Sequence, residues 1–340
     1  MPDNIAATLL DWYDANARDL PWRAAPGATL ANPYWVWLSE VMLQQTQVAT
    51  VKPYFAKFLA RWPDFASLAA ADDADVMAAW AGLGYYARAR NMLACARAIA
   101  AGGMPETEEG LRALPGVGAY TAAAIAAIAF GRRAVVVDGN VERVVARLFA
   151  LAEPLPGAKP RIWALTDSIT PDARAGDFAQ AMMDLGSGIC TARRPRCLLC
   201  PLRPSCAGFA SGAPEMFPVK AAKSAKPKRY GTLFWAECDG EVLLVQRPAK
   251  GLFGGMRALP TSEWGSTRTG LESPPFQAGW RLLDSKVNHS LTHFDLELDL
   301  AVAQVERHVS GLWWPVAEIG SAGLPSVFAK AARIFMGETG

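Results

Sequence analysis

Four of the six cysteines in this 340-residue chain fall within 17 residues, and no other feature restricts the possible fold so strongly. They follow the pattern Cys-x6-Cys-x2-Cys-x5-Cys, at Cys190, Cys197, Cys200 and Cys206. In a reducing cytosol, one metal-binding loop explains such an array better than disulfides do. Four thiolates suit zinc or a [4Fe–4S] cluster. Zinc sites usually contain two Cys-x2-Cys pairs and this array contains one, so the spacing favours the cluster.

The sequence around these cysteines is basic. The segment 185–214 contains no acidic residue but includes Arg193, Arg194, Arg196 and Arg203. The whole chain has a net charge of only +2, so this local excess, and not the overall charge, indicates phosphate as a partner. A second basic tract, residues 220–229, contains the proline and alanine typical of a solvated linker.

The sequence argues against two classes of protein. The longest uncharged apolar run, residues 119–130, has 12 residues, whereas a membrane span needs about 20. The N-terminus lacks the basic flank and the apolar segment of a secretory signal. We therefore expect a cytoplasmic protein.

The hydrophobic pattern changes along the chain. Up to about residue 206, apolar residues recur with helical spacing between short turn signals. The later part has the pattern of a mixed α/β domain, with strands expected at 231–238, 241–246 and 295–302 and a turn at Asp239-Gly240. We predict a helical domain at 1–206, a basic linker at 207–229 and a second domain at 230–340.

Two carboxylic acids of the helical half are candidates for catalysis. All three histidines lie beyond residue 230, so acid–base chemistry in the helical half rests on carboxylates. Glu40 lies in the apolar segment 34–43, where burial would raise its pKa and keep it protonated as a general acid. Asp138 precedes a helix expected at 141–151 and could face a developing cation. The ordinary alternatives are a helix-surface glutamate and a helix N-cap.

Two further motifs indicate contact with nucleic acid. Gln44-Gln45-Thr46 carries short polar side chains that could enter a base stack, although helix-surface amides are the ordinary explanation. A short helix capped by Thr107 leads into Gly116-Val117-Gly118 and then into an alanine-rich helix. Such a turn could aim backbone N–H groups at one phosphate, and the alternative is a plain interhelical turn.

Taken together and in this order, the motifs resemble those of the MutY adenine DNA glycosylases, which belong to the helix-hairpin-helix superfamily. The resemblance extends from about residue 20 to 206 and, more loosely, through the C-terminal domain. It rests on the cysteine array, the glycine hairpin and three further motifs, namely Glu40 with Gln44-Gln45-Thr46, Gly82-Leu83-Gly84-Tyr85-Tyr86, and Val137-Asp138-Gly139-Asn140.

The resemblance implies a mainly α protein: a helix-hairpin-helix DNA glycosylase of two helical subdomains with an iron–sulfur loop, followed by an α/β Nudix-like domain. It implies that the cysteine array holds one [4Fe–4S] cluster rather than zinc. The implied activity is the removal of adenine mispaired with 8-oxoguanine or guanine in double-stranded DNA. The implied protein acts as a monomer at the bacterial nucleoid.

The resemblance also implies roles for individual residues. Glu40 would protonate adenine at N7, and Asp138, supported by Asn140, would stabilise the oxocarbenium ion. The hairpin residues Gly116, Val117 and Gly118 would hold the DNA backbone.

Five other residues would contact bases, by the same resemblance. Gln45 and Tyr85 would wedge into the stack beside the orphaned base. Arg23, Gln180 and Asp184 would line the adenine pocket.

Tyr120 bears on the type of reaction. Related endonuclease III-like enzymes carry a lysine at this position, whose amine attacks the sugar and leads to strand cleavage. A tyrosine cannot form that Schiff base, so we expect an abasic product in an intact strand. The remaining alternatives are a pyrimidine glycosylase with lyase activity, a Nudix hydrolase with a DNA-binding appendage, and a non-catalytic metal-containing DNA-binding protein.

The C-terminal domain departs from the family pattern at two places. Gln246-Arg247-Pro248 resembles the MutT-like domain, but residues 261–280 lack the glutamate-rich Nudix box, so pyrophosphatase activity is not expected. The Phe-Ser-His loop with which the family reads 8-oxoguanine is Leu291-Thr292-His293 here. Thr292 and His293 would keep the reading role without the aromatic ring, so recognition is expected to be weaker or differently arranged. The alternative for His293 is an ordinary strand-end histidine.

Overall fold

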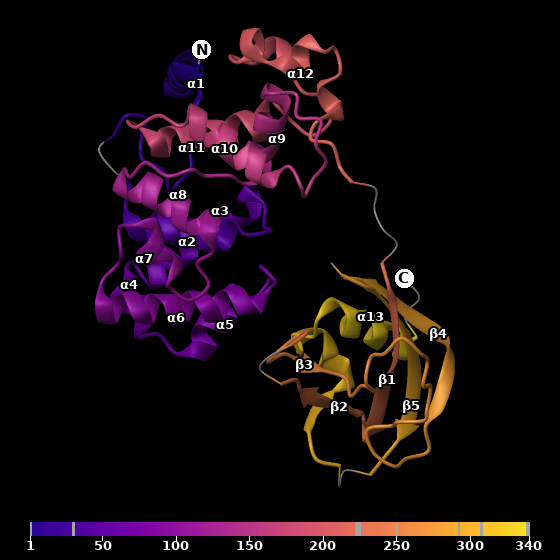
Figure 1. The fold of residues 1–340 in the computed structure, drawn as a ribbon. Helices are drawn as coiled ribbons and strands as arrows, with labels where there is room; N and C mark the ends of the chain where they lie inside the picture. The colour runs from indigo at the N-terminus through magenta and orange to yellow at the C-terminus, as the bar shows by residue number, and fades with distance from the viewer. Residues whose placement is uncertain are drawn as a thin grey trace. The chain divides into compact units, whose positions relative to one another are not determined.

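The structure is a computed structural model that describes residues 2–28, 31–221, 226–248, 251–291, 293–306 and 309–337 (Figure 1). The chain divides into two compact units, Met1–Ala222 and Lys223–Gly340. The first unit is helical, and the second is built on a β-sheet. Within the described ranges, no helix is both long enough and apolar enough to cross a membrane.

Seven helices of the first unit surround one apolar core, in which Trp37, Phe55 and Trp80 are fully buried. The seventh of these helices, Ala119–Phe130, is rich in alanine and is buried on most of its sides. Their bounds are α2 Pro33–Leu43, α3 Val48–Arg61, α4 Phe65–Ala69, α5 Asp73–Trp80, α6 Tyr86–Gly102, α7 Glu108–Arg112 and α8 Ala119–Phe130.

The N-terminal helix α1 (Pro2–Asn16) packs with late helices of the unit and not with its neighbours in sequence. Its residues Leu9 and Tyr13 are fully buried in a second core. The other helices of this core are α9 Gly139–Leu148, α10 Lys159–Ile169 and α11 Ala175–Gly188. The chain therefore passes from one core to the other before α2 and again after α8, which produces the two expected helical subdomains (Figure 1).

Side-chain caps fix where several of these helices begin. Asn32 accepts hydrogen bonds from two backbone N–H groups of α2, and Pro33 is the first residue of that helix. As predicted, Thr107 caps α7 by accepting a backbone N–H group at 3.2 Å. Asp138 caps α9, also as predicted, and this helix begins two residues earlier than expected. Such caps contribute about 1 kcal/mol each to stability.

The segment after α11 remains attached to the first unit. The buried Arg147 donates to the carbonyl oxygen of Phe217 at 3.1 Å, and backbone hydrogen bonds of 2.8 and 3.2 Å join Leu155 to Val219 and Ala221. Ordered structure therefore continues well into the stretch predicted as a linker at 207–229. The short elements of this segment are η1 Cys197–Leu199, η2 Arg203–Ser205, α12 Ala207–Ala210 and η3 Pro214–Met216.

The second unit is a six-stranded sheet in the order β3-β2-β1-β5-β4, with β6 paired to β2. Strands β1 and β5 are parallel, and the other pairs are antiparallel. The helix α13 packs on the sheet through Val327, Phe328 and Ala331. The bounds are β1 Lys228–Cys238, β2 Glu241–Gln246, β3 Arg257–Ala258, β4 Arg281–Ser290, β5 Asp295–Gln304, β6 Leu312–Pro315, η4 Val316–Ser321 and α13 Ser326–Phe335.

The three strands expected from the sequence are present as β1, β2 and β5. The predicted turn between the first two is also present, because Asp239 and Gly240 both have positive φ angles, 49° and 76°. This pair of conformations is the one that closes a two-residue hairpin.

Candidate active site

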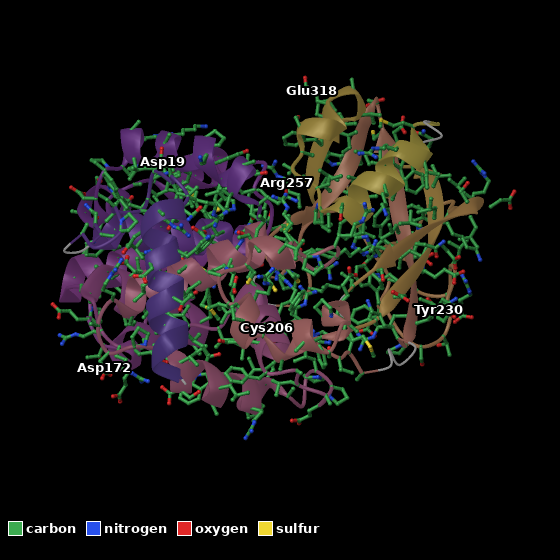
Figure 2. All side chains as sticks on the ribbon, turned by 90° about the horizontal axis from the view of Figure 1, so that it is seen from above. Asp19, Asp172, Cys206, Tyr230, Arg257 and Glu318 are labelled. Carbon is green, nitrogen blue, oxygen red and sulfur yellow. The ribbon has the colours of Figure 1, made fainter. Side chains whose placement is uncertain are left out.

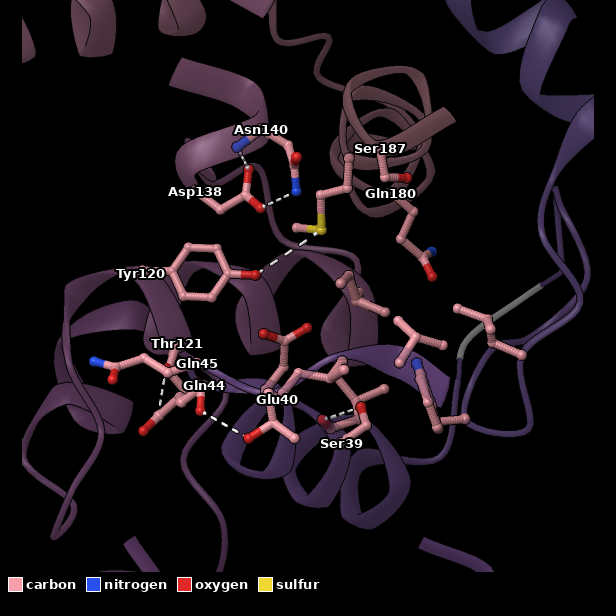
Figure 3. A pocket seen from close by; sticks show the side chains of 18 of the residues that line it. Ser39, Glu40, Gln44, Gln45, Tyr120, Thr121, Asp138, Asn140, Gln180 and Ser187 are labelled. Carbon is pink, nitrogen blue, oxygen red and sulfur yellow. Dashed lines mark hydrogen bonds between the residues drawn. The ribbon is translucent and has the colours of Figure 1, made fainter. Parts of the chain in front are cut away.

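A cleft of about 1200 Å³ is lined by residues from both helical subdomains, including residues of α2, α8 and α11 (Figure 3). Small-molecule sites usually measure about 300–1,000 Å³, so this cleft has room for a ligand of nucleotide size. Most residues that the sequence nominated in the helical unit line it: Arg23, Glu40, Gln45, Gly116, Gly118, Tyr120, Asp138, Asn140 and Gln180.

Glu40 is the buried acid of the cleft. It lies on α2 with 7% of its surface exposed, among apolar neighbours. Burial raises the pKa of Glu40 from 4.5 to about 7; hydrogen bonding with Tyr120 and the charge of Arg23 lower it, while the charge of Asp138 raises it. Because burial is the largest of these effects, a large fraction of the molecules keeps the proton near neutral pH, as a general acid requires.

Tyr120 extends from the first turn of α8 toward Glu40 (Figure 3). Its hydroxyl donates to the sulfur of Met183 on α11, at 3.9 Å. Burial holds the pKa of Tyr120 well above 10, and the charges of Glu40 and Asp138 add to that increase. Tyr120 therefore keeps a neutral hydroxyl group. Its one hydrogen can be donated to one acceptor, and its oxygen can accept a hydrogen bond at the same time.

Three N–H groups hold the carboxylate of Asp138. It accepts the backbone N–H groups of Asn140 at 2.8 Å and Val141 at 2.7 Å, and the side-chain amide of Asn140 at 2.9 Å. The amide oxygen of Asn140 accepts from Arg143 at 2.9 Å. Gly186 lets α11 approach closely, because a Cβ atom there would lie 2.6 Å from Cβ of Asn140. The cap of α9 and the candidate site therefore use the same carboxylate (Figure 3).

Arg23 reaches the cleft from the segment before α2 and is fixed by Asp184. The two side chains form a bidentate pair with N–O distances of 2.7 and 3.0 Å, and they are 8% and 2% exposed. Asp184 also accepts from Nε of Arg18 at 2.6 Å. Asp184 does not line the cleft, whereas Gln180, one turn earlier on α11, does line it. The carboxylate of Asp184 is instead bound by the guanidinium groups of Arg18 and Arg23, which themselves line the cleft.

Gln45 and Tyr85 share an uncommon backbone conformation, with φ angles of 57° and 50°. Gln45 lines the cleft, whereas Tyr85 does not line it and is 64% exposed. Arg88 joins the two turns, because it donates to the carbonyl oxygens of Met42 and Leu83, each at 2.9 Å. Both predicted wedge residues therefore lie on turns that one half-buried guanidinium restrains.

The predicted hairpin connects α7 to α8. Gly116 has a φ of 74°, and a Cβ atom there would lie 2.6 Å from Cβ of Asn91, so the turn requires glycine. The side chain of Val117 is buried in the first core. Gly118 is the N-cap of α8 and offers no side chain to the first N–H groups of that helix. Backbone donors are thus available at the cleft, as an anion-binding turn needs.

The four cysteines lie in one loop, and Cys206 at its end is labelled in Figure 2. Arg147 donates to the sulfur of Cys190 at 3.3 Å, and the thiol of Cys206 donates to the carbonyl oxygen of Arg147 at 3.6 Å. The pKa of the Cys200 thiol is raised to about 11, chiefly by burial and to a smaller extent by the three other thiols, while hydrogen bonding with the backbone of Leu202 lowers it. In the described part of the chain, no three His, Cys, Asp or Glu side chains form a ready metal site. The donor set, thiols without carboxylate or imidazole, fits a thiolate-held group.

In the second unit, His293 is exposed on the connection between β4 and β5. Thr292 lies outside the described residues. The carbonyl oxygen of Leu291 accepts from Lys226 at 2.6 Å. A separate pocket of about 480 Å³ includes Arg247 and Trp264, with the guanidinium 5.3 Å from the ring centre. His293 is not among the residues that line this pocket.

Sequence reasoning did not nominate three other side chains of the cleft. Arg18 lines it beside Arg23, Thr121 accepts from Gln44 at 3.4 Å, and Met183 accepts from Tyr120. The contacts of Thr121 and Met183 join segments far apart in the chain, which local patterns do not report. Only Met183 had a signal, since it follows Gln180 by three residues and therefore shares its helix face.

The arrangement suits the cleavage of a bond whose leaving group needs a proton. A protonated acid and a carboxylate held by N–H donors face one cleft from different subdomains, as carboxylate pairs do in glycoside hydrolysis. Among the described residues, neither histidine nor lysine lines the cleft. Glu40 is the buried carboxylic acid that lines the cleft.

Comparison with known proteins gives consistent matches for both units. Residues 38–161 match the model of the HhH-GPD superfamily base excision DNA repair proteins, and residues 232–333 match that of the NUDIX domain. The chain is 38% identical over 311 residues to the human adenine DNA glycosylase, covering 76% of this chain and 57% of that protein. It is 30% identical over 363 residues to the adenine DNA glycosylase of Buchnera aphidicola subsp. Schizaphis graminum, covering 96% and 97%.

A solved structure is also similar to the helical unit. It is the structure of a thermostable thymine-DNA glycosylase, with a TM-score of 0.55, 28% identity, and coverage of 61% of this chain and 95% of that one. The fold class expected from the sequence, a helical helix-hairpin-helix unit followed by a Nudix-like unit, is thereby confirmed. The chain spans less than two thirds of the length of the human relative.

Proposed function

Because this chain belongs to the adenine DNA glycosylase family, we propose that it removes adenine from double-stranded DNA as a base-excision repair enzyme. The observation that carries the proposal is the buried Glu40 on one wall of the cleft and Asp138, with its three N–H donors, on another. The proposed substrates are adenines mispaired with 8-oxoguanine or guanine. The proposed enzyme acts as a monomer on nucleoid DNA in the cytoplasm.

Adenine has to leave the base stack before it can react, because its glycosidic bond is out of reach inside a duplex. Gln45 and Tyr85 would fill the space that the flipped base vacates. Arg23, fixed by Asp184, and Gln180 would then orient the base in the cleft. The flipped base thus meets Glu40 with its position already restrained.

Glu40 transfers its proton to N7 of adenine, which makes the base a better leaving group. The C1′–N9 bond then breaks, its electron pair passes to the purine, and adenine leaves as a neutral base. The sugar keeps the positive charge as an oxocarbenium ion, opposite the carboxylate of Asp138. Water adds to C1′ and gives one proton back to the Glu40 carboxylate, so atoms and charge balance.

The strand would stay intact after this reaction. No lysine lines the cleft among the described residues. By the resemblance to the family, Tyr120 stands where related endonuclease III-like enzymes carry the attacking lysine. A phenol hydroxyl cannot form the Schiff base that precedes β-elimination. The product would be an abasic site that breaks only in alkali.

The grip on DNA would come from the hairpin and from the cysteine loop. Gly116, Val117 and Gly118 would present backbone N–H groups to a phosphate. Cys190, Cys197, Cys200 and Cys206 would hold a [4Fe–4S] cluster, whose thiolate donors they can supply. When bound, the cluster would supply a rigid support for the loop that carries four arginines.

The C-terminal unit would read the base opposite adenine. We assign this role to Thr292 and His293, in a domain proposed to extend over residues 230–340 after the linker at 207–229. His293 is exposed, as a residue that contacts DNA must be. The helical domain at 1–206 would then carry the chemistry alone.

The test is single-turnover release of adenine from three duplexes, in which adenine faces 8-oxoguanine, guanine or thymine. Each reaction is divided, and one half is treated with hot alkali. We expect release from the first two duplexes only, with strand breaks only after alkali. Release from none of them, together with tight binding to the mispairs, would overturn the proposal in favour of a binding protein. Strand breaks without alkali would overturn the monofunctional mechanism.

A further inference from the structure

The hydroxyl group of Tyr120 has one hydrogen atom and two neighbours that can take it. One neighbour is the sulfur of Met183, to which the hydroxyl donates at 3.9 Å. The other is the carboxyl group of Glu40, whose pKa is lowered by hydrogen bonding with Tyr120. Because one hydrogen cannot serve both acceptors at once, the protonation state of Glu40 decides where it goes.

We propose that Met183 is a positioning residue of the glycosylase reaction: its sulfur accepts the Tyr120 hydrogen while Glu40 is protonated and gives it up when Glu40 becomes a carboxylate. This inference rests on the proposed function, because it assumes that Glu40 acts as the acid. While Glu40 carries its proton, it can donate to the oxygen of Tyr120, and the tyrosine hydrogen then needs another acceptor. Met183, three residues after Gln180 on the cleft face of α11, supplies one.

A thioether is suited to this role because it is a weak acceptor. A strong acceptor, such as a carboxylate or an amide oxygen, would keep the tyrosine hydrogen and leave the Glu40 carboxylate without a donor after proton transfer. An aliphatic side chain would offer no acceptor, so the hydroxyl would donate to Glu40 at all times. Such a permanent donor stabilises the charged form and weakens the tendency of Glu40 to hold its proton. The thioether of Met183 is intermediate in acceptor strength between a carboxylate or amide oxygen and an aliphatic side chain.

The other groups around Glu40 do not take over this function. Asp138, at the start of α9, already accepts three N–H groups. Arg23 has only donors, and its guanidinium is bound to Asp184, which also binds Arg18. Among the described groups that face Glu40 and Tyr120, Met183 is thus the acceptor that the hydroxyl uses in this structure.

The main test is the pH profile of single-turnover adenine release by full-length Met183→Leu, which keeps the volume and removes the acceptor. The rate should fall with rising pH at a midpoint about half a pH unit lower than in the unchanged enzyme, which is about threefold slower release above the midpoint. Below the midpoint the two rates should agree. An equal loss of rate at every pH would show a merely structural role and overturn the proposal, as would an unchanged profile.

Two controls isolate the sulfur of Met183. Met182→Leu changes the adjacent methionine, which is buried in the second core and does not line the cleft, and should leave the midpoint unchanged. In a Tyr120→Phe background there is no hydrogen to place, so adding Met183→Leu should produce no further shift. A further shift in that background would contradict the proposal.

A measurement without DNA separates this inference from the proposed function. The infrared band of the protonated Glu40 carboxyl is identified as the band lost in Glu40→Gln, and its titration midpoint is compared between the unchanged protein and Met183→Leu. A lower midpoint in the variant supports the proposal, and equal midpoints overturn it. Absence of adenine release at any pH, combined with a lower infrared midpoint, would refute the proposed function and Met183's role in the reaction, and would leave only the placement of the Tyr120 hydrogen by Met183 and Glu40 supported.

Discussion

The two units of this chain contain similar charged groups, which are buried in the first unit and more exposed in the second. In the helical unit, Glu40 is 7% exposed at the cleft, and the Arg23–Asp184 pair is buried beside it. In the second unit, Glu297 and Asp299 alternate with buried leucines along β5 and pair with Arg268, which is 36% exposed. Burial changes what an ionisable group can do, because the charged form loses its hydration. We therefore expect large effects from substitutions in the first unit and small effects in the second.

The largest expected effect is on the rate of adenine release by Glu40→Gln. The amide keeps the shape of the side chain but has no proton to transfer, so the single-turnover rate should fall about a thousandfold. Binding to a mispaired duplex should be nearly unchanged. Glu153→Gln, at an exposed glutamate outside the cleft, is the matched control and should keep full rate. Unchanged turnover of Glu40→Gln would remove Glu40 from the mechanism.

The same substitution should stabilise the protein in alkaline solution. The folded-state pKa of Glu40, about 7, lies above its usual value of 4.5, so between these values the folded protein keeps a proton that the unfolded chain loses. The free energy of unfolding therefore falls as pH rises through this window, by about 3 kcal/mol once pH exceeds 7. Glu40→Gln lacks this loss.

Urea denaturation of both proteins at several pH values measures this difference. The stability gained by Glu40→Gln should be small near pH 4 and should grow until about pH 8. A gain that is the same at every pH would contradict the folded-state pKa given above.

The next effect in size is the loss of stability in Arg23→Ala. This change removes one partner of the buried pair and leaves Asp184 with Arg18 alone. Removing a partner from a buried ion pair usually costs about 3–5 kcal/mol, and we expect about 2 kcal/mol because Arg18 remains. Chemical denaturation checks this value. A cost below 0.5 kcal/mol would mean that the buried pair behaves like a surface pair.

The smallest effect is expected at the corresponding pairs of the second unit. Arg268→Ala removes the ion pairs with Glu297 and Asp299 on the outer face of the sheet. Lys228 and Lys286 remain near these carboxylates, and exposed pairs contribute about 0–1 kcal/mol. The free energy of unfolding should change by less than 1 kcal/mol, and adenine release should be unchanged. A loss comparable to that of Arg23→Ala would refute the contrast between the units.

The sequence predicted those parts of the site whose signal is local. Glu40 stood among apolar residues, and Asp138 stood directly before a helix, so each could be nominated from its neighbours. Asp184 was nominated only through the family resemblance, and its contacts are with arginines more than 160 residues earlier in the chain. Tertiary packing decides which groups cover a buried carboxylate, and the spacing of residues in the sequence does not reveal those groups. The spacing of Met183 from Gln180 indicated its helix face, but its contact with Tyr120, 63 residues earlier in the chain, depends on the same packing.

The fold shows the same limit. Strand β5 was predicted because acidic residues alternate with leucines, but its parallel pairing with β1 follows from topology and not from pattern. Strand β4 was not predicted, because most of its residues are exposed and their burial does not alternate regularly. The strands β3 and β6 have two and four residues, too few to show a period.

The left-handed turns at Gln45 and Tyr85 have a consequence for protein engineering. A non-glycine residue in this conformation carries about 1–3 kcal/mol of strain, which glycine would relieve. A library screened for heat resistance alone would therefore enrich glycine at both positions and discard the two side chains proposed to fill the space of the flipped base. Screens that improve this protein have to select for adenine release together with stability, because at these positions the two goals conflict.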